Sequence, residues 1–332
     1  MDSHKDGYRS LFWPVMLIGI GALWLLGNLN LLNLNMLSML AALWPLLLVG
    51  AGLDLLFARR SPVIGALIAL LLVGAAAFVL ISGASLGIQL PNAGEFKVEE
   101  FTAPIDGAQS ATINLDTSSQ PVAISSLERS ENLLEATIGH YGQMDFLISG
   151  GADRQITLRR QPTVGFSMDF VPPQNAKWEI YLTRDIPIDL RIDSGSGSIA
   201  MDLSQTTLSA FALDSGSGSG SMVLPASADG YTAEVNSGSG SISIDLPADS
   251  TLTLRIDSGS GSVNIDLPDG AAARVEVQNG GSGAVRLPAE LDRIEGDSGE
   301  DEGVWETDGF SSAQHKIEII LEDVGSGSIT VR

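Results

Sequence analysis

Two patterns of hydrophobic and polar residues divide this chain. Residues 11–90 are almost wholly apolar, whereas from about residue 97 onward apolar and polar residues alternate with a period of two. A long apolar run is typical of a membrane-spanning helix, and strict alternation is typical of a half-buried strand. The pattern therefore predicts a membrane-anchored protein with a helical N-terminal region and an all-β domain.

Three stretches of the first region are long enough to cross a bilayer, namely residues 11–29, 39–57 and 63–83. At about 1.5 Å per residue, a 19-residue helix extends roughly 28 Å, which is close to the hydrocarbon thickness. The first stretch is long for the apolar part of a signal peptide, and no small-residue cleavage site follows it. We therefore predict a three-helix transmembrane region over residues 11–83.

The basic residues of this region predict its orientation. Lys5 and Arg9 precede the first span, Arg59 and Arg60 lie between the second and third, and the loop between the first two spans has no charge. The positive-inside rule then places residues 1–10 in the cytoplasm. Three spans leave a linker, residues 84–96, and an extracytoplasmic β-repeat domain, residues 97–332, outside the cell membrane.

The first two spans resemble each other. Aligning Trp13 with Trp44 superposes two pairs of glycines, Gly19 on Gly50 and Gly21 on Gly52. Glycine lets a neighbouring helix approach closely. We favour packing within the three-helix unit over a binding face for a partner.

The β domain contains a repeat built around the sequence SGSG. Its copies begin at Asp193, Asp214, Asn236 and Asp257, which are 21, 22 and 21 residues apart, and the repeat is clearest over residues 189–288. A shortened copy covers 275–288, a late copy covers 323–331, and a diverged one covers 114–124. A fixed period of this length is typical of stacked structural units.

Each copy predicts a strand, a tight turn and a second strand. Apolar residues alternate on both sides of the turn, as at Leu252, Leu254 and Ile256 before it and at Val263 and Ile265 after it. Glycine supplies the positive φ angles of tight turns, and Asp or Asn caps them through side-chain-to-backbone hydrogen bonds. We therefore expect these two roles for the glycines and the Asp or Asn residues of the repeat.

Two arrangements fit this repeat. A β-solenoid with coils of about 21 residues would stack its rungs about 4.8 Å apart. The alternative is a stack of antiparallel hairpins with SGSG at the tip. Strand pairing separates them, because equivalent strands of a solenoid pair in parallel, whereas the two strands of a hairpin pair antiparallel with each other.

Stacking also aligns equivalent side chains. It would bring together Asp193, Asp214, Asn236 and Asp257 as one column, and Asp245 and Asp266 as a second. Stacked carboxylates repel one another unless they are protonated or bridged by a cation such as calcium. We favour solvated capping residues over weak cation binding as the interpretation of these columns. The acidic residues 295–309 are interpreted as a solvated insertion.

Charge and composition exclude several function classes. Residues 91–332 carry 14 basic and 37 acidic residues, and such a surface repels nucleic acid. The chain has no cysteine, so disulfides and thiol chemistry are excluded. None of the three histidines, His4, His140 and His315, has a metal-ligand spacing, and no nucleophile or phosphate-binding motif occurs. We predict no enzyme activity and no catalytic, cofactor-binding or metal-ligating residues.

Two segments resemble known bacterial families. WPVMLIGIGALWLLGNLNLL, continued by LWPLLLVGAGLDLL, is similar to the LiaI/LiaF-like transmembrane region of cell-envelope proteins. The DSGSGSI and IDLP repeats resemble the toastrack-type, adhesin-like β-strand repeat domain. The resemblance implies a right-handed β-solenoid tethered to the membrane, with a sensory, regulatory or adhesive role and without catalytic residues.

The function that follows is a non-enzymatic accessory in sensing or regulation of envelope stress. The alternative is a surface adhesin or scaffold that binds wall polymers or proteins. The resemblance implies a membrane histidine kinase as the target of LiaF-type regulators. The three predicted spans depart from that arrangement, because they place the β domain outside the cell.

Overall fold

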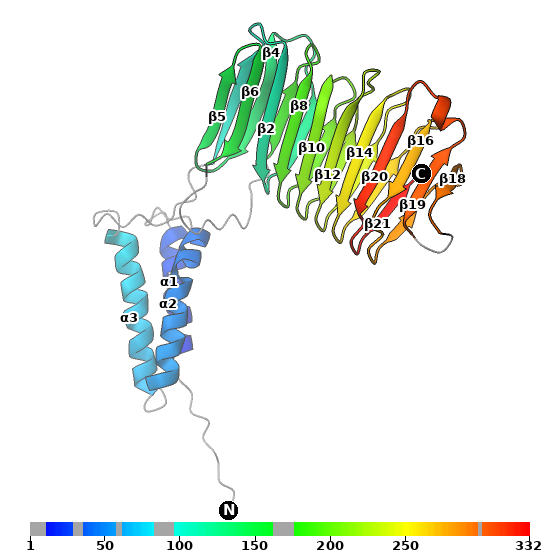
Figure 1. Cartoon of the computed structure of the whole chain (residues 1–332). Coiled ribbons are helices and arrows are strands. Elements are labelled where there is room, and N and C mark those ends of the chain that lie inside the picture. Colours follow the sequence, from blue (N-terminus) through cyan, green and yellow to red (C-terminus); the bar gives the residue numbers. More distant parts are fainter. Residues whose placement is uncertain (1–10, 29–35, 58–61, 83–95, 162–175, 298–300) are drawn as a thin grey trace, which may run out of the picture. The chain divides into compact units, whose positions relative to one another are not determined.

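The computed structural model describes residues 11–28, 36–57, 62–82, 96–161, 176–297 and 301–332. These residues form a helical unit and a separate β unit that begins at Phe96 (Figure 1). The predicted cytoplasmic residues 1–10 lie outside the described residues, as do Arg59, Arg60 and nearly all of the predicted linker 84–96.

The helical unit has one helix at each predicted span. They are α1 (Phe12–Asn28), α2 (Met36–Phe57) and α3 (Pro62–Ser82). Among the described residues, no helix combines the length and the hydropathy needed to cross a membrane.

Two of the four matched glycines pack against α3. A Cβ on Gly19 would lie 2.4 Å from a methyl carbon of Val73, and a Cβ on Gly50 would lie 2.3 Å from a methyl carbon of Leu72. Glycine at these positions lets the side chains of Val73 and Leu72 lie directly against the helix backbone. The predicted packing within the unit is confirmed for Gly19 and Gly50. The corresponding positions on Gly21 and Gly52 have no atom within 4 Å in the part of the chain that the structure describes.

The β unit consists of two mixed, largely parallel sheets. The ten-stranded sheet has the spatial order β1 (Lys97–Pro104), β4 (Asn132–His140), β7 (Trp178–Leu182), β3 (Val122–Ser126), β9 (Ile199–Asp202), β11 (Gly220–Val223), β13 (Ser241–Asp245), β15 (Ser262–Asp266), β21 (Ser328–Val331) and β17 (Ala284–Arg286). The eleven-stranded sheet has the order β18 (Leu291–Glu295), β19 (Gly303–Thr307), β16 (Ala273–Val277), β20 (Ile317–Asp323), β14 (Leu252–Ser258), β12 (Tyr231–Ser237), β10 (Leu208–Ser215), β8 (Ile188–Ser194), β2 (Ser110–Ser118), β6 (Asp153–Arg160) and β5 (Met144–Gly150).

Strand pairing decides between the two predicted arrangements. The two strands of one copy, such as β8 and β9, lie in different sheets, and equivalent strands of successive copies pair in parallel. The stacked-hairpin alternative is therefore wrong for residues 188–266. We call two consecutive strands, one from each sheet, together with the turn that joins them a rung. Antiparallel pairs occur at the ends of the sheets, where β1, β4 and β7 pair on one side and β16, β19 and β18 pair on the other.

The order of the rungs departs from the chain order at two places. The rung of β2 and β3 lies next to that of β8 and β9, although β4 to β7 intervene in the sequence. The rung of β20 and β21, formed by the last residues of the chain, lies between β14–β15 and β16–β17. A winding that adds each coil after the previous one would place residues 323–331 at the end of the stack. The uninterrupted sequential stacking implied by the solenoid prediction is thus wrong at both places.

The acidic segment 295–309 was predicted to be a solvated insertion, and this is wrong for part of it. Residues Gly303–Thr307 form β19, which pairs antiparallel with β16 and with β18. The half-buried Trp305 packs against the hydrophobic core. The apolar residues within the acidic run thus incorporate it into the sheet.

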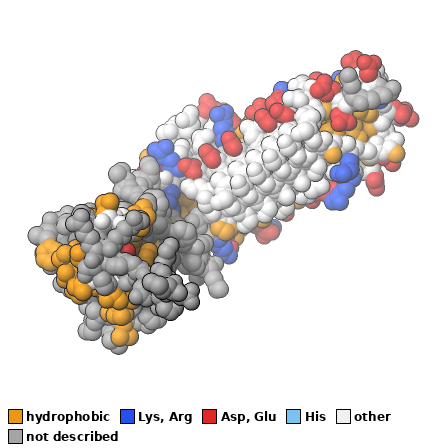
Figure 2. All heavy atoms as spheres, turned by 90° about the horizontal axis from the view of Figure 1, so that it is seen from below, with side chains coloured by type: hydrophobic (Ala, Val, Ile, Leu, Met, Phe, Trp, Pro, Cys, Tyr) orange, Lys and Arg blue, Asp and Glu red, His pale blue; other side chains and the backbone are white. Residues whose placement is uncertain are grey.

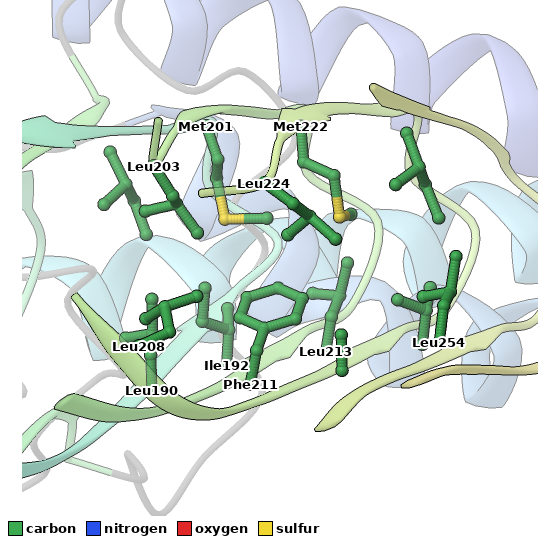
Figure 3. Close-up of a cluster of buried hydrophobic side chains, with 14 of the residues drawn as sticks. Leu190, Ile192, Met201, Leu203, Leu208, Phe211, Leu213, Met222, Leu224 and Leu254 are labelled. Atoms are coloured by element: carbon green, nitrogen blue, oxygen red, sulfur yellow. The ribbon is translucent and has the colours of Figure 1, made fainter. Parts of the chain in front are cut away.

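The core lies between the sheets and follows the predicted alternation. Strand β12 has the pattern buried–exposed along its whole length. Figure 3 shows Met201 and Met222 from the ten-stranded sheet facing Ile192 and Phe211 from the eleven-stranded sheet. Every rung adds the same kind of apolar layer, so the stack buries one continuous core.

The glycines of the SGSG turns have a different role from the one predicted. A positive φ angle occurs at none of the following: Gly195, Gly197, Gly216, Gly218, Gly238, Gly240, Gly259 and Gly261. A Cβ on Gly218 would instead lie 1.9 Å from the carbonyl oxygen of Gly197, and one on Gly240 would lie 1.6 Å from that of Gly218. Glycine is needed because each turn lies directly against the turn of the neighbouring rung.

Hydrogen bonds continue from the strands through these turns. The amide of Ser217 donates to the carbonyl of Gly195 at 2.9 Å, and the amide of Ser239 donates to that of Gly216 at 2.8 Å. The turns are therefore part of the ladder that joins the rungs, which explains why SGSG recurs at a fixed period.

This geometry predicts a clear difference between two neighbouring substitutions. We expect Gly240→Ala to destabilise the β unit by about 1–3 kcal/mol, because the new methyl group overlaps a backbone atom that cannot move without disturbing the stack. Ser239→Ala, at an exposed side chain, should change stability by no more than about 0.5 kcal/mol. Urea unfolding of the full chain, followed by circular dichroism, measures both. Equal midpoints for the two variants would contradict this account of the turn.

Candidate functional site

The predicted aspartate column exists on the outer face of the eleven-stranded sheet. Asp214 lies opposite Asp193 on one side and Asn236 on the other, and Asn236 lies opposite Asp257. We call these four residues the aspartate column. The same register adds Asp116 next to Asp193 and Asp323 next to Asp257. Both additions come from the copies at 114–124 and 323–331, so aligning those copies could have identified them.

A shallow groove of about 370 Å³ follows the start of this column. Its lining includes the carboxylates of Asp116, Asp193, Asp214 and Glu234 and the guanidinium groups of Arg159 and Arg191. Both arginines are held by other carboxylates. Arg191 donates to Asp189 at 3.1 and 2.7 Å, and Arg159 donates to Asp145 at 3.2 Å.

Burial and charge repulsion act together on the central carboxylate. Partial burial raises the pKa of Asp193 above its ordinary value, and the neighbouring Asp116 and Asp214 raise it further. Asn236 interrupts the column with an uncharged side chain at the second position beyond Asp193. The carboxylates of the column therefore repel one another, and within these four residues Asn236 is the position that carries no charge.

The column does not have the arrangement of a metal centre. Within residues 96–161, 176–297 and 301–332, no three Asp, Glu or His side chains converge so that they could hold a metal ion. Calcium takes six to eight oxygen ligands around one point, whereas these carboxylates follow one another along the stack at about 4.8 Å. Weak cation binding thus stays a prediction from charge alone.

The predicted capping role is wrong for the aspartate column. Among the described residues, the side chains of Asp193, Asp214, Asn236 and Asp257 make no hydrogen bond to a turn backbone. Capping occurs instead in the other three copies of the repeat, at residues 114–124, 275–288 and 323–331. Asp116 accepts from the Ser118 amide at 3.1 Å, Asn279 from the Gly281 amide at 3.0 Å, and Asp323 from the Gly325 amide at 2.8 Å.

The backbone explains this difference between the turns. Ser118, Gly281 and Gly325 have φ angles of 52°, 56° and 58°, and each lies two residues after the capping side chain. That geometry brings an amide within reach of the side chain. The SGSG turns of the four copies that begin at residues 193, 214, 236 and 257, which we call the regular turns, have no positive φ angle. Their amides donate hydrogen bonds to the neighbouring rung instead.

The second predicted column, on the ten-stranded sheet, is closed by a cation. Asp245 lies opposite Asp266, and the guanidinium of Arg332 pairs with both carboxylate oxygens of Asp266, one of them at 3.3 Å. This hydrogen bond holds the pKa of Asp266 below its ordinary value, whereas partial burial and the neighbouring Asp266 raise that of Asp245. Arg332 was missed by the sequence analysis, although GSGSITVR aligned with GSGSVNID places Arg332 at the position of Asp266.

The two described histidines lie in different surroundings. The buried His140 has Nε2 3.4 Å from a carboxylate oxygen of Glu99 on the neighbouring strand. His315 lines a hollow together with Asp249 and Ser250. The Ser250 hydroxyl, however, donates to the carbonyl of Ser227 at 3.3 Å and accepts from its amide at 2.9 Å. His4 lies outside the described residues.

The turns form a different kind of surface. The second serine of each regular turn, namely Ser196, Ser217, Ser239 or Ser260, is exposed. Figure 2 shows a broad band along the β unit with neither charged nor hydrophobic side chains, bordered by acidic and basic ones. The unit therefore presents hydroxyl and peptide groups in register beside the charged face.

The repulsion within the aspartate column predicts a pH-dependent effect of two opposite substitutions. Because the pKa of Asp193 is raised in the folded state, its ionisation lowers stability as the pH rises above its ordinary value. At pH 7 we expect Asp193→Asn to stabilise the β unit and Asn236→Asp to destabilise it, each by less than about 1 kcal/mol because the side chains are exposed. Both differences should disappear near pH 2, where the carboxylates are protonated in both states. Urea unfolding at the two pH values tests this, and a difference that persists in acid would exclude the electrostatic cause.

The comparisons with known proteins agree with this architecture. Residues 11–56 match the model of the LiaI-LiaF-like transmembrane region, and residues 92–245 match that of the N-terminal domain of toast_rack, DUF2154. No curated protein matches the chain. A crystal structure described as a "putative cell adhesion protein" from Clostridium sporogenes is similar with a TM-score of 0.50 and 18% identity, covering 71% of this chain and 99% of that one. This likeness concerns the fold. Two segments of the chain are thus similar to known families, one to the LiaI-LiaF-like transmembrane region and the other to the N-terminal domain of toast_rack.

Proposed function

We propose that this chain is a non-enzymatic accessory protein of the bacterial cell envelope, which senses or regulates the response to envelope stress. The observation that carries the proposal is the combination of a LiaI-LiaF-like transmembrane region with a β unit that presents a regular, polar and strongly acidic face. Such a face suits recognition of a polar or basic partner and repels anionic polymers.

The geometry favours binding over catalysis. The carboxylates of the groove are spread along the stack, and its guanidinium groups are held by Asp189 and Asp145. Catalysis requires a nucleophile or base within hydrogen-bond distance of a second reactive group. In the hollow lined by Asp249, Ser250 and His315, the serine hydroxyl is bound to the backbone of Ser227.

The proposal includes a topology. The three helices would span the membrane with residues 1–10 in the cytoplasm and the β unit outside, which the distribution of Lys and Arg supports. Residues 188–266 would wind as a right-handed β-solenoid. Parallel pairing of equivalent strands supports this winding, since crossovers between parallel strands of one sheet are nearly always right-handed.

A surface adhesin or scaffold is the second candidate. The fold likeness to the Clostridium sporogenes structure and the band of exposed serines on the turns favour it. A scaffold would use the same face to bind wall polymers or proteins, with no signal passed to the cell.

The proposed topology predicts that the end of the chain is accessible from outside. In intact cells that carry a C-terminal epitope tag, added protease should remove the tag while a cytoplasmic control protein stays whole. The cleavage should occur, and be detectable, without lysis of the cells. Cleavage that occurs only after lysis would place the β unit in the cytoplasm.

The regulatory role predicts a signalling phenotype. Deleting the gene should change the induction of an envelope-stress reporter by cell-wall antibiotics, and the full chain should restore it. A chain that carries Gly240→Ala should restore it less well than one with Ser239→Ala. An unchanged reporter, together with binding of the purified full chain to wall polymers or cells, would favour the scaffold instead.

A further inference from the structure

Residues 317–332, which contain β20 and β21, lie between two parts of the β unit that precede them in the sequence, and we call them the insert. Strand β20 pairs in parallel with β14 on one side and with β16 on the other, and β21 pairs in the same way with β15 and β17. Neither β16 nor β17 pairs with β14 or β15. Residues 273–307 are thus joined to the regular stack through this last rung.

The insert is bonded on both sides at its turn as well as along its strands. The amides of Ser326 and Ser328 donate to the carbonyls of Gly259 and Gly261 at 2.8 and 3.0 Å. On the other side, the amide of Ser282 donates to the carbonyl of Gly325 at 2.8 Å. A Cβ on Gly327 would lie 1.8 Å from the carbonyl oxygen of Gly261, so the fit leaves no room for a side chain there.

Buried side chains and ion pairs add specificity to this fit. Ile319, Leu321 and Ile329 are fully buried between the sheets. Three ion pairs join the insert to both neighbours, namely Glu322 with Arg255, Glu318 with Arg274 at 3.8 Å, and Arg332 with Asp266. The segment that fits this position therefore has alternating apolar residues, a GSGS turn and charges at three defined places.

A connection over residues 308–316, with the short 3₁₀ helix Phe310–Ser312, leads into β20, and β21 ends one residue before the end of the chain. Phe310 is buried against the guanidinium of Arg274, 4.7 Å from its ring centre.

We propose that the space between the rungs β14–β15 and β16–β17 is a binding site for an extended segment, filled by residues 317–332 of the same chain and equally able to accept those residues from a second copy. Exchange of an identical element between two copies is a low-cost route to a dimer, because it replaces every contact by the same contact. The two copies would then be joined through their C-terminal rungs.

The test uses the full chain with a site for a specific protease inserted between Ala313 and Gln314. Cutting the folded protein should leave the insert in place. A labelled peptide of residues 314–332 should then replace it and migrate with the protein, faster as urea is raised toward the unfolding transition. The first control is a peptide with Gly327→Ala, which should bind at least about tenfold more weakly because its methyl group meets the Gly261 carbonyl. The second is a peptide with Ser326→Ala, which loses only the exposed hydrogen bond of 3.3 Å between the Ser326 and Ser282 hydroxyl groups and should bind within about threefold of the natural peptide.

A second variant covers the case in which the cut insert never leaves. A chain ending at Ala313 should lose protease protection over residues 273–307, with a change in Trp305 fluorescence, and the added peptide should restore both. Failure of the natural peptide to bind either protein overturns the proposal. Equal binding of the Gly327→Ala peptide, or protection of residues 273–307 without any peptide, overturns it as well.

Discussion

The close contact between turn backbones controls the rest of the β unit. Each SGSG turn lies so near the next that a Cβ would overlap a carbonyl oxygen, and the amides of the turn donate across that contact. This contact sets the turns at the same spacing as the strands, about 4.8 Å, so the sheets need no adjustment at their edges. Parallel pairing, layered apolar side chains and aligned outer side chains all follow from that common spacing.

The alignment of equivalent side chains brings carboxylates close together, and the chain limits their repulsion in two ways. Repeating a residue at a fixed register places like charges next to each other, and this adds to partial burial in raising the pKa of Asp193. On the eleven-stranded sheet, the amide side chain of Asn236 separates Asp214 from Asp257. On the ten-stranded sheet, Arg332 follows Asp266 and neutralises it. The two columns are thus interrupted at Asn236 and at Arg332, whereas Asp116, Asp193 and Asp214 remain in direct succession.

The sequence predicted the features that depend on the period, and it failed for those that depend on the order of the rungs. Alternation gave the strands and the buried side, and the spacing of Asp193 and Asp214 gave the column. Any permutation of equivalent rungs keeps the same period, so the insertion of β20 between β14 and β16 left no trace in the pattern. The role of the glycines was misjudged for a similar reason, because a turn seen alone suggests positive φ whereas the constraint comes from the neighbouring turn.

The ends of the stack show why the repeat stops. A parallel stack exposes unpaired backbone groups on its last strand, which invites further pairing. Here antiparallel strands cover most of these edges, with β4 and β1 beyond β7 and with β19 and β18 beyond β16. The remaining parallel edge, β17, has only three residues, too few for a stable pairing with another sheet. Because the rung of β20 and β21 is inserted before this end, it pairs on both sides and leaves none of its backbone at an edge of either sheet.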